Sequence, residues 1–150
     1  MMILFFFDRK EEYRRPVSID TVWVNYMTNK PKIRFGKSEN RCRQILEDYF
    51  KVPFKKVKPD FLRYKNGKNL ELDMYNETLG ICCEYDGVQH AEFSPFFHKT
   101  EQDFIDQMER DKFKKERCKE LGLKLINVPH TVKYENLEEY LIKEIKNLKI

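Results

Sequence analysis

The 150-residue chain lacks any apolar segment long enough to cross a bilayer. Its longest apolar run, residues 2–7, is far shorter than the roughly 20 residues that a membrane-spanning helix needs. That run also lacks the basic leader and the small-residue cleavage site of a signal peptide. Internal repeats and low-complexity tracts are missing too. We therefore expect no membrane partner and an intracellular location, in the cytoplasm or the nucleus.

Cysteine pairs with a recognisable spacing are also missing. The four cysteines are Cys42, Cys82, Cys83 and Cys118, and no two of them form a Cys-x-x-Cys pair. The spacing of a zinc site or a redox motif is therefore absent. Adjacent Cys82 and Cys83 would point to opposite faces of a strand. We interpret all four as buried thiols rather than as a disulfide framework.

The composition favours one compact domain with a basic surface. Hydrophobic residues make up 41% of the chain and aromatic residues 14%, enough for a core in a domain of this length. Charged residues reach 36%, with a net charge of +4. This balance is compatible with a nucleic-acid partner, because clustered lysine and arginine attract phosphate.

The first 35 residues are predicted to form an N-terminal β extension of a core domain that spans residues 36–150. Residues 2–7 would form one strand. Residues 17–27 would form another, because they are rich in β-branched and aromatic side chains. Extra packing strands are the favoured interpretation, and a dimer contact and a nucleic-acid clamp are the alternatives.

The core domain is predicted to begin with a helix over residues 38–50 that has Ser38 as its N-cap. Helical spacing predicts a buried stripe on this helix, made of Cys42, Ile45, Leu46, Tyr49 and Phe50. An extended segment over residues 54–64 then leads into Asn66-Gly67, which indicates a type I′ hairpin. Strands over residues 70–75 and 79–86 would complete a three-stranded meander.

A long helix is predicted over residues 101–121, with Gly122 as the residue that follows its end. One stripe of this helix combines Phe104, Met108, Asp111, Lys115 and Cys118. Its two charged members either border solvent or face a polar site. A buried strand over residues 123–128 and a helix over residues 134–148 follow. This order predicts an α/β fold in which helices flank a mixed central sheet on both faces.

Acidic residues gather on the two strands of the hairpin over residues 70–86. Period-two alternation places Glu71, Asp73 and Tyr75 on one face of the first strand, and Glu84 and Asp86 on one face of the second. Negative charge beside a buried sheet is costly without a positive partner. We therefore expect a divalent cation, held by carboxylate oxygens.

Other candidates adjoin this cluster. Glu39 either reaches it from the first helix or only complements the positive N-terminus of that helix. Asp86 has a site role or is part of a turn before Gly87. Gln89 and His90 follow directly, and His90 is either a general base or a structural residue of an aromatic loop.

The element order and these acids resemble the restriction-endonuclease-like PD-(D/E)xK nuclease superfamily, and more narrowly its very-short-patch-repair-like branch. The core of that superfamily is αβββαβ, and the resemblance covers about residues 38–130. It is carried by Leu72-Asp73, by Glu84-Tyr85-Asp86-Gly87-Val88-Gln89-His90, and by Arg110-Asp111 followed by Lys114 and Lys115.

The resemblance implies a Mg²⁺- or Mn²⁺-dependent endonuclease that hydrolyses phosphodiester bonds in DNA. Because that branch has small relatives in bacteria, phages and large DNA viruses, the resemblance also makes a phage or a virus one source of such a chain. Asp73 and Glu84 would be metal ligands, joined by Glu39 as the acidic residue of the first helix. The ion would activate a water molecule and neutralise charge on the phosphate. The full set of candidate catalytic residues is Glu39, Asp73, Glu84, Asp86, Gln89 and His90.

The chain departs from the superfamily pattern at Asp86, where a lysine is expected. The task of activating water would then fall to His90, Gln89 or one of two helix-borne lysines, Lys114 and Lys115. Candidate DNA contacts are Lys99, Arg110, Lys114 and Lys115.

Two further hypotheses come from other classes of protein. The missing lysine favours a nuclease-fold protein that binds nucleic acid without cutting it, with strong salt dependence. The other hypothesis is an interaction domain that forms a homodimer through residues 1–35. The nuclease interpretation requires Asp73 and Glu84 to converge, without an arginine that neutralises one of them and leaves no room for an ion.

Overall fold

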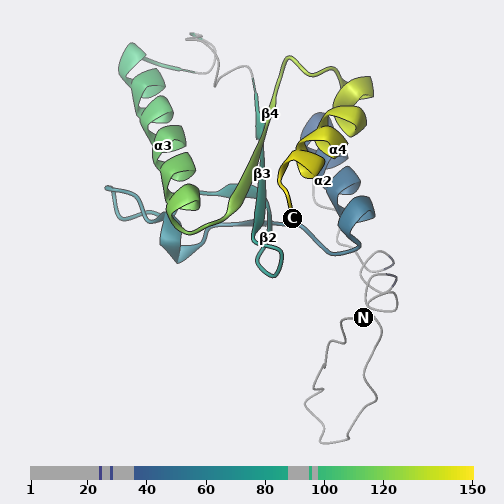
Figure 1. Cartoon of the computed structure of the whole chain (residues 1–150). Coiled ribbons are helices and arrows are strands. Elements are labelled where there is room, and N and C mark those ends of the chain that lie inside the picture. Colours follow the sequence, from purple (N-terminus) through teal and green to yellow (C-terminus); the bar gives the residue numbers. More distant parts are fainter. Residues whose placement is uncertain (1–23, 25–27, 29–35, 88–94, 96–97) are drawn as a thin grey trace, which may run out of the picture.

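The computed structural model describes residues 24, 28, 36–87, 95 and 98–150. These residues form an α/β arrangement in which α-helices cover a four-stranded mixed sheet (Figure 1). Along the chain the order is helix, three strands, helix, strand and helix. The order of elements predicted from the sequence is confirmed.

The sheet has the order β1-β2-β3-β4. Strands β1 (Lys55–Val57), β2 (Leu72–Asn76) and β3 (Ile81–Asp86) form an antiparallel meander, and β4 (Lys124–Pro129) lies parallel to β3. The first four residues of β3 are buried, because this strand has a neighbour on each side and helices above and below. The predicted mixed sheet is therefore confirmed.

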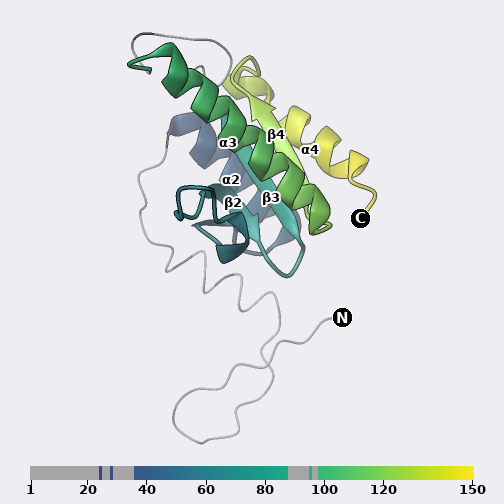
Figure 2. The same cartoon turned by 90° about the vertical axis from the view of Figure 1, so that its left-hand side faces the viewer.

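Helix α3 (Glu101–Glu120) covers one face of the sheet, and α2 (Lys37–Phe50) and α4 (Leu137–Asn147) cover the other (Figures 1 and 2). A core forms on each face. The core under α2 and α4 includes Cys42, Leu46, Met74, Cys83, Val128 and Leu141. The core under α3 is formed by Leu62, Leu72, Cys82 and Cys118. All four cysteines are buried free thiols, as predicted.

The predicted ends are correct for α3, and for α2 the predicted end at Phe50 is correct whereas the predicted N-cap is wrong. Thr100 and Asp103 form a capping box at the start of α3, and Gly122 has the positive φ of 69° expected after its end. Helix α2 begins at Lys37 with Gly36 as its N-cap and has no side-chain cap. Ser38 therefore lies inside the helix and does not cap it.

The buried face of α2 differs from its predicted stripe. Tyr49 is 47% exposed, whereas Arg43 and Glu47 are buried on the face that packs onto the sheet. Helical spacing identifies apolar stripes, and it gives no signal for two charged side chains that are buried because they bind backbone groups. The contacts of this pair are described below.

The hairpin around Asn66-Gly67 is not a type I′ turn. Gly67 has φ 77°, but Asn66 is not among the described residues with positive φ, and a type I′ turn needs positive φ at both central positions. The backbone N–H of Gly67 instead donates to Tyr64 O at 2.8 Å. The turn therefore runs from Tyr64 to Gly67, and Gly67 is the residue that adopts the left-handed conformation.

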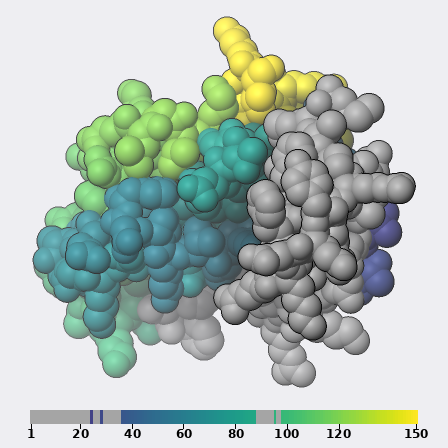
Figure 3. Space-filling model, turned by 90° about the horizontal axis from the view of Figure 1, so that it is seen from below, coloured from purple at the N-terminus to yellow at the C-terminus, as the bar shows by residue number. Residues whose placement is uncertain are grey.

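The extended segment predicted over residues 54–64 is shorter in the structure. It ends in a 3₁₀ turn, η1 (Asp60–Leu62), which packs against α3 through a hydrogen bond of 3.1 Å from Arg117 Nε to Phe61 O. Figure 3 shows the blue-to-teal residues of this region beside green residues that belong to α3.

Most of the predicted N-terminal β extension lies outside the described residues, as does any dimer contact there. Val24 and Thr28 are described and are helical, with the Thr28 hydroxyl donating to Val24 O at 2.8 Å. The predicted strand over residues 17–27 is therefore wrong at Val24. In the part of the chain that the structure describes, no helix is long and apolar enough to span a membrane.

Candidate active site

A β-bulge in β2 directs Asp73 into the candidate site. Between two registered pairs, the single residue Lys56 of β1 stands opposite two residues of β2, Asp73 and Met74. The extra residue turns Leu72 and Met74 toward opposite cores, although they are two positions apart. The strict alternation predicted for residues 70–75 is therefore wrong at this point. Bulges commonly re-aim a side chain in this way.

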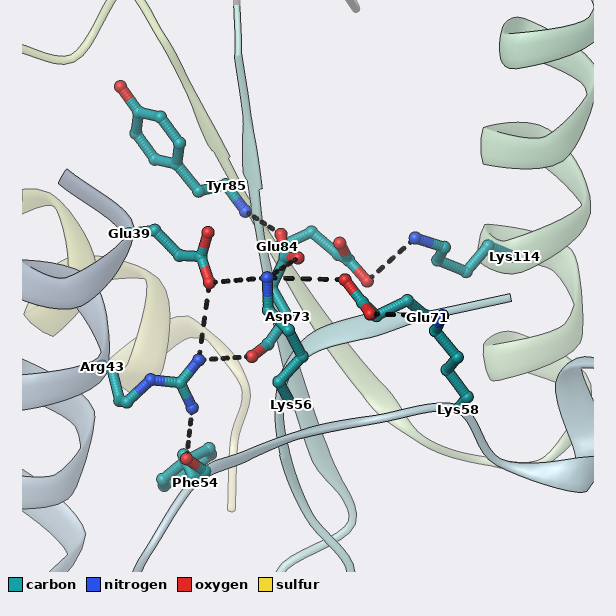
Figure 4. A network of polar contacts seen from close by, with 10 residues as sticks. All are labelled: Glu39, Arg43, Phe54, Lys56, Lys58, Glu71, Asp73, Glu84, Tyr85 and Lys114. Atoms are coloured by element: carbon teal, nitrogen blue, oxygen red, sulfur yellow. Dashed lines mark hydrogen bonds and ion pairs between the residues drawn. The ribbon is translucent and has the colours of Figure 1, made fainter. Parts of the chain in front are cut away.

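Asp73 and Glu84 lie side by side on β2 and β3. The Asp73 carboxylate accepts a hydrogen bond of 3.2 Å from the backbone N–H of Tyr85. Asp73 lies opposite Glu84, one position along from the paired residues Met74 and Cys83, and the negative charge of Asp73 acts on the Glu84 carboxyl. Figure 4 shows the two acids between α2 on one side and α3 on the other. The convergence on which the nuclease interpretation depends is therefore present.

Glu84 is a buried acid with an unusual protonation equilibrium. Its side chain is 10% exposed, and its Oε1 lies 3.1 Å from Lys114 Nζ of α3. Burial raises the pKa of Glu84 to about 8; the Lys114 ammonium opposes this shift, and the negative charge of Asp73 adds to it. Near neutral pH, Glu84 therefore holds a proton that a bound cation could replace.

Lys56 contributes a positive charge that the sequence analysis missed. Its Nζ lies 3.0 Å from Glu39 Oε1, 3.4 Å from Glu71 Oε1 and 3.5 Å from Asp73 Oδ1. Burial lowers the pKa of Lys56, but the three carboxylates outweigh it and raise the pKa above its ordinary value. Lys56 is therefore an ammonium ion at neutral pH. No pattern distinguishes it from neighbouring lysines, because its contacts depend on the bulge opposite.

Glu39 reaches the cluster from the first turn of α2, so it does more than complement the helix N-terminus. Its side chain is 16% exposed and lies 3.0 Å from Lys56 Nζ and 3.5 Å from an Arg43 nitrogen. Arg43 donates to the backbone carbonyl of Asp73 at 2.6 Å rather than to its carboxylate. The arginine therefore leaves the Asp73 carboxylate available to other partners.

A small cleft opens beside Glu84, between β3, β4 and α3. It is lined by Glu84, Asp86, Asp111, Lys114, Lys115, Leu125 and Asn127. Asp86 is the last residue of β3 and accepts a hydrogen bond of 2.9 Å from Asn127 Nδ2. Its side chain therefore bonds the neighbouring strand β4 rather than the backbone of a turn. Asp111 lines this polar cleft. Of the two alternatives stated for the charged residues of its stripe, solvent or a polar site, Asp111 therefore takes the polar site.

The predicted stripe of α3 is wrong at Met108, which is 52% exposed. Lys115 borders solvent and also lines the cleft, in agreement with the alternatives stated for the charged members of the stripe. Lys114 is the lysine that reaches Glu84. Lys99 is exposed just before α3, and Arg110 is half-buried on it.

Two candidate catalytic residues, Gln89 and His90, lie outside the described residues, as does most of the aromatic loop around them. His98, which follows this loop, is buried and bonds Gln107 through its ring at 2.9 Å. His98 therefore has a structural role.

The donor set suits a hard divalent cation. Within residues 36–87 and 98–150, no three His, Cys, Asp or Glu side chains are grouped as a ready metal site. Asp73 and Glu84 lie opposite each other on β2 and β3, and carboxyl oxygens are the ligand type that Mg²⁺ and Mn²⁺ prefer. Mg²⁺ commonly takes one or two protein carboxylates and keeps several waters, so two acids fit this ion.

Similar proteins are encoded by viruses. Uncharacterized protein 307L of Invertebrate iridescent virus 6 is 35% identical over 139 residues, which cover 82% of this chain and 70% of that protein. Uncharacterized protein 094L of Frog virus 3 is 40% identical over 110 residues, which cover 72% of this chain and 70% of that protein. The chain belongs to this viral protein family.

A third relative of the viral family is covered over a smaller share of its length. Uncharacterized protein 033L of Invertebrate iridescent virus 3 is 42% identical over 114 residues, which cover 75% of this chain and 59% of that protein. The chain therefore spans less than two thirds of that relative's length. No family model and no solved structure matches the chain.

Proposed function

We propose that the chain is a metal-dependent endonuclease that hydrolyses phosphodiester bonds in DNA, with a restriction-endonuclease-like αβββαβ core. One observation carries the proposal. Asp73 and Glu84 come from neighbouring strands, lie opposite each other and have lysines on both sides. Two acids held together in a poorly solvated site favour a bound cation. The order of helix, three strands, helix and strand supports the same assignment.

Asp73 and Glu84 would hold Mg²⁺ or Mn²⁺ through their carboxylate oxygens, and Glu39 would act from α2 through Lys56 and through water. When bound, the ion supplies a water molecule of lowered pKa and neutralises charge on the phosphate. The backbone N–H of Tyr85 fixes one oxygen of Asp73 at 3.2 Å, so the protein orients this carboxylate before a cation arrives.

Lys114 is the best replacement for the lysine that the superfamily pattern places two residues after Glu84. Asp86 holds that position and bonds Asn127 instead. Lys114 reaches the same Glu84 carboxylate from α3, at 3.1 Å. Its ammonium can donate hydrogen bonds to a water molecule or to a phosphate oxygen. Gln89 and His90 remain candidates for accepting the proton of the attacking water.

The test is a cleavage assay on duplex, nicked, mismatched and branched DNA with Mg²⁺ or Mn²⁺. We expect the wild type to cleave at least one of these substrates, and Asp73→Asn and Glu84→Gln to be about 10³-fold slower or inactive, because each loses a charged ligand. The matched control is Asp60→Asn, whose side chain is 91% exposed and which should cleave normally. Wild type that leaves every substrate intact would overturn the proposal.

A second candidate is a protein of the same fold that binds nucleic acid without cutting it. It is favoured by the lysine partners themselves, since Lys56 and Lys114 already balance Asp73 and Glu84. Calorimetry with Mn²⁺ separates the candidates. A nuclease should bind the ion in a manner that Asp73→Asn abolishes, whereas a binding-only protein should bind DNA equally well in EDTA.

A further inference from the structure

Two buried charges on α2 take no part in the proposed chemistry. Arg43 is 2% exposed and Glu47 is 0% exposed. They lie one turn apart on the face of α2 that packs onto the sheet. A buried charge is costly unless hydrogen bonds compensate it, so their partners show what the pair contributes.

Both residues bind the main chain at Phe54, immediately before β1. Glu47 Oε1 accepts from Phe54 N at 3.0 Å, and an Arg43 Nη donates to Phe54 O. The two charged side chains therefore bind both the backbone N–H and the backbone carbonyl of Phe54. This arrangement fixes the start of β1, which carries Lys56 two residues later.

Arg43 extends further than Glu47. Its second Nη donates to Asp73 O at 2.6 Å and lies 3.5 Å from Glu39 Oε1. Figure 4 shows the guanidinium between Glu39, the Phe54 carbonyl and the Asp73 carbonyl. One side chain thus ties α2, the start of β1 and the bulge of β2 together.

The contact with Asp73 falls where regular pairing between β1 and β2 is interrupted. At the bulge, two residues of β2 oppose the single residue Lys56. Regular hydrogen bonds between β1 and β2 are therefore interrupted there and do not fix the orientation of the Asp73 peptide group. Arg43 provides a charge-assisted hydrogen bond at this point, and such bonds are about twice as strong as neutral ones.

We propose that Arg43 is a positioning residue for the site: by holding the carbonyl of Asp73 at the bulge, it directs the Asp73 carboxylate to Glu84 and to the N–H of Tyr85. The consequence for cleavage rests on the proposed function, whereas the positioning itself does not. The planar guanidinium is needed because it donates to two carbonyls at once, which a lysine ammonium on a flexible stem does not reproduce.

The decisive variant is Arg43→Lys, which keeps the charge and loses the planar fork. Its matched control is Arg41→Lys on the same helix, where the arginine makes a surface ion pair of 2.8 Å with Glu138. A second control is Leu46→Ala, which should destabilise the core under α2 without touching Asp73. Urea unfolding establishes that each variant is folded and how stable it is.

The readout is amide hydrogen exchange along β3. Tyr85 N–H donates to the Asp73 carboxylate, whereas Cys83 lies in the regular ladder with β2. We expect Arg43→Lys to accelerate exchange at Tyr85 at least tenfold more than at Cys83. Arg41→Lys should change neither, and Leu46→Ala should accelerate both by the same factor. Equal acceleration at Tyr85 and Cys83 in Arg43→Lys would overturn the proposal.

Two further measurements keep the inference decidable. In the cleavage assay, Arg43→Lys should lower kcat about tenfold with KM for DNA unchanged; if the wild type does not cleave, the proposed function fails while the exchange data still decide the role of Arg43. If Arg43→Lys does not fold, nuclear Overhauser contacts between the guanidinium protons of Arg43 and the Asp73 backbone in wild type decide it, and their absence overturns it.

Discussion

Asp73 lies opposite Glu84 across the β2–β3 pair, and each carboxyl has a lysine within 3.5 Å. Lys56 of β1 lies beside Asp73, and Lys114 of α3 lies beside Glu84. The acids and the lysines come from four different elements, so the site exists only in the folded chain. Its electrostatics lead to four predictions.

Asp73→Asn should lower the pKa of Glu84. Burial is the largest cause of the raised value of about 8, and the negative charge of Asp73 adds to it. Removing that charge leaves burial and the opposing Lys114 ammonium. A ¹³C NMR titration of the Glu84 carboxyl should therefore show a midpoint below that of the wild type. A midpoint that stays the same would mean that the two acids do not interact.

The stability of the metal-free protein should fall as the pH rises from about 4.5 to about 8. The folded chain holds the Glu84 proton up to about pH 8, whereas the unfolded chain releases it near the ordinary glutamate pKa of 4.5. The folded state therefore binds more protons in this window, and the free energy of unfolding decreases with pH there. Urea unfolding across the window, with Glu84→Gln as the comparison, measures this contribution. Glu84→Gln should flatten the curve, and an identical slope in both proteins would contradict the prediction.

Binding of Mn²⁺ should become tighter toward pH 8 and should release a proton. The cation requires an ionised Glu84, whose pKa is raised by burial to about 8, so affinity should fall by up to about tenfold per pH unit below that value. Calorimetry at pH 6, 7 and 8 in two buffers of different ionisation enthalpy measures both effects. An affinity that is independent of pH would place the cation away from Glu84.

Lys56→Met should destabilise the metal-free protein and increase its stabilisation by Mn²⁺. The ammonium of Lys56 balances Glu39, Glu71 and Asp73, so its loss should cost about 1 kcal/mol without metal. The uncompensated carboxylates should then attract a divalent cation more strongly. Thermal melts in EDTA and in Mn²⁺ provide the measurement.

The matched control for Lys56 is Lys58→Met. Lys58 is 65% exposed and lies 3.8 Å from Glu71, so its replacement should leave both melting temperatures near those of the wild type. A smaller Mn²⁺-induced rise in Lys56→Met than in wild type would show that the lysine supports the cation rather than competes with it.

The sequence by itself determined the α/β class, the order of the elements and the positions of the acids. Periodicity and turn residues are local signals, and apolar runs mark β3 and β4. The pattern also predicted that Asp73 and Glu84 converge, since neighbouring strands place alternate side chains on a shared face.

Only the tertiary structure decided how the site is built. The bulge at Asp73, the approach of Lys56 and the burial of Arg43 and Glu47 depend on the register between β1 and β2 and on the packing of α2. A shift of one residue turns a side chain to the other face of the sheet, and no local sequence signal reports where such a shift occurs. For the same reason, Lys114 rather than Lys115 reaches Glu84: the rotation of α3 about its axis is set by its contacts with the sheet.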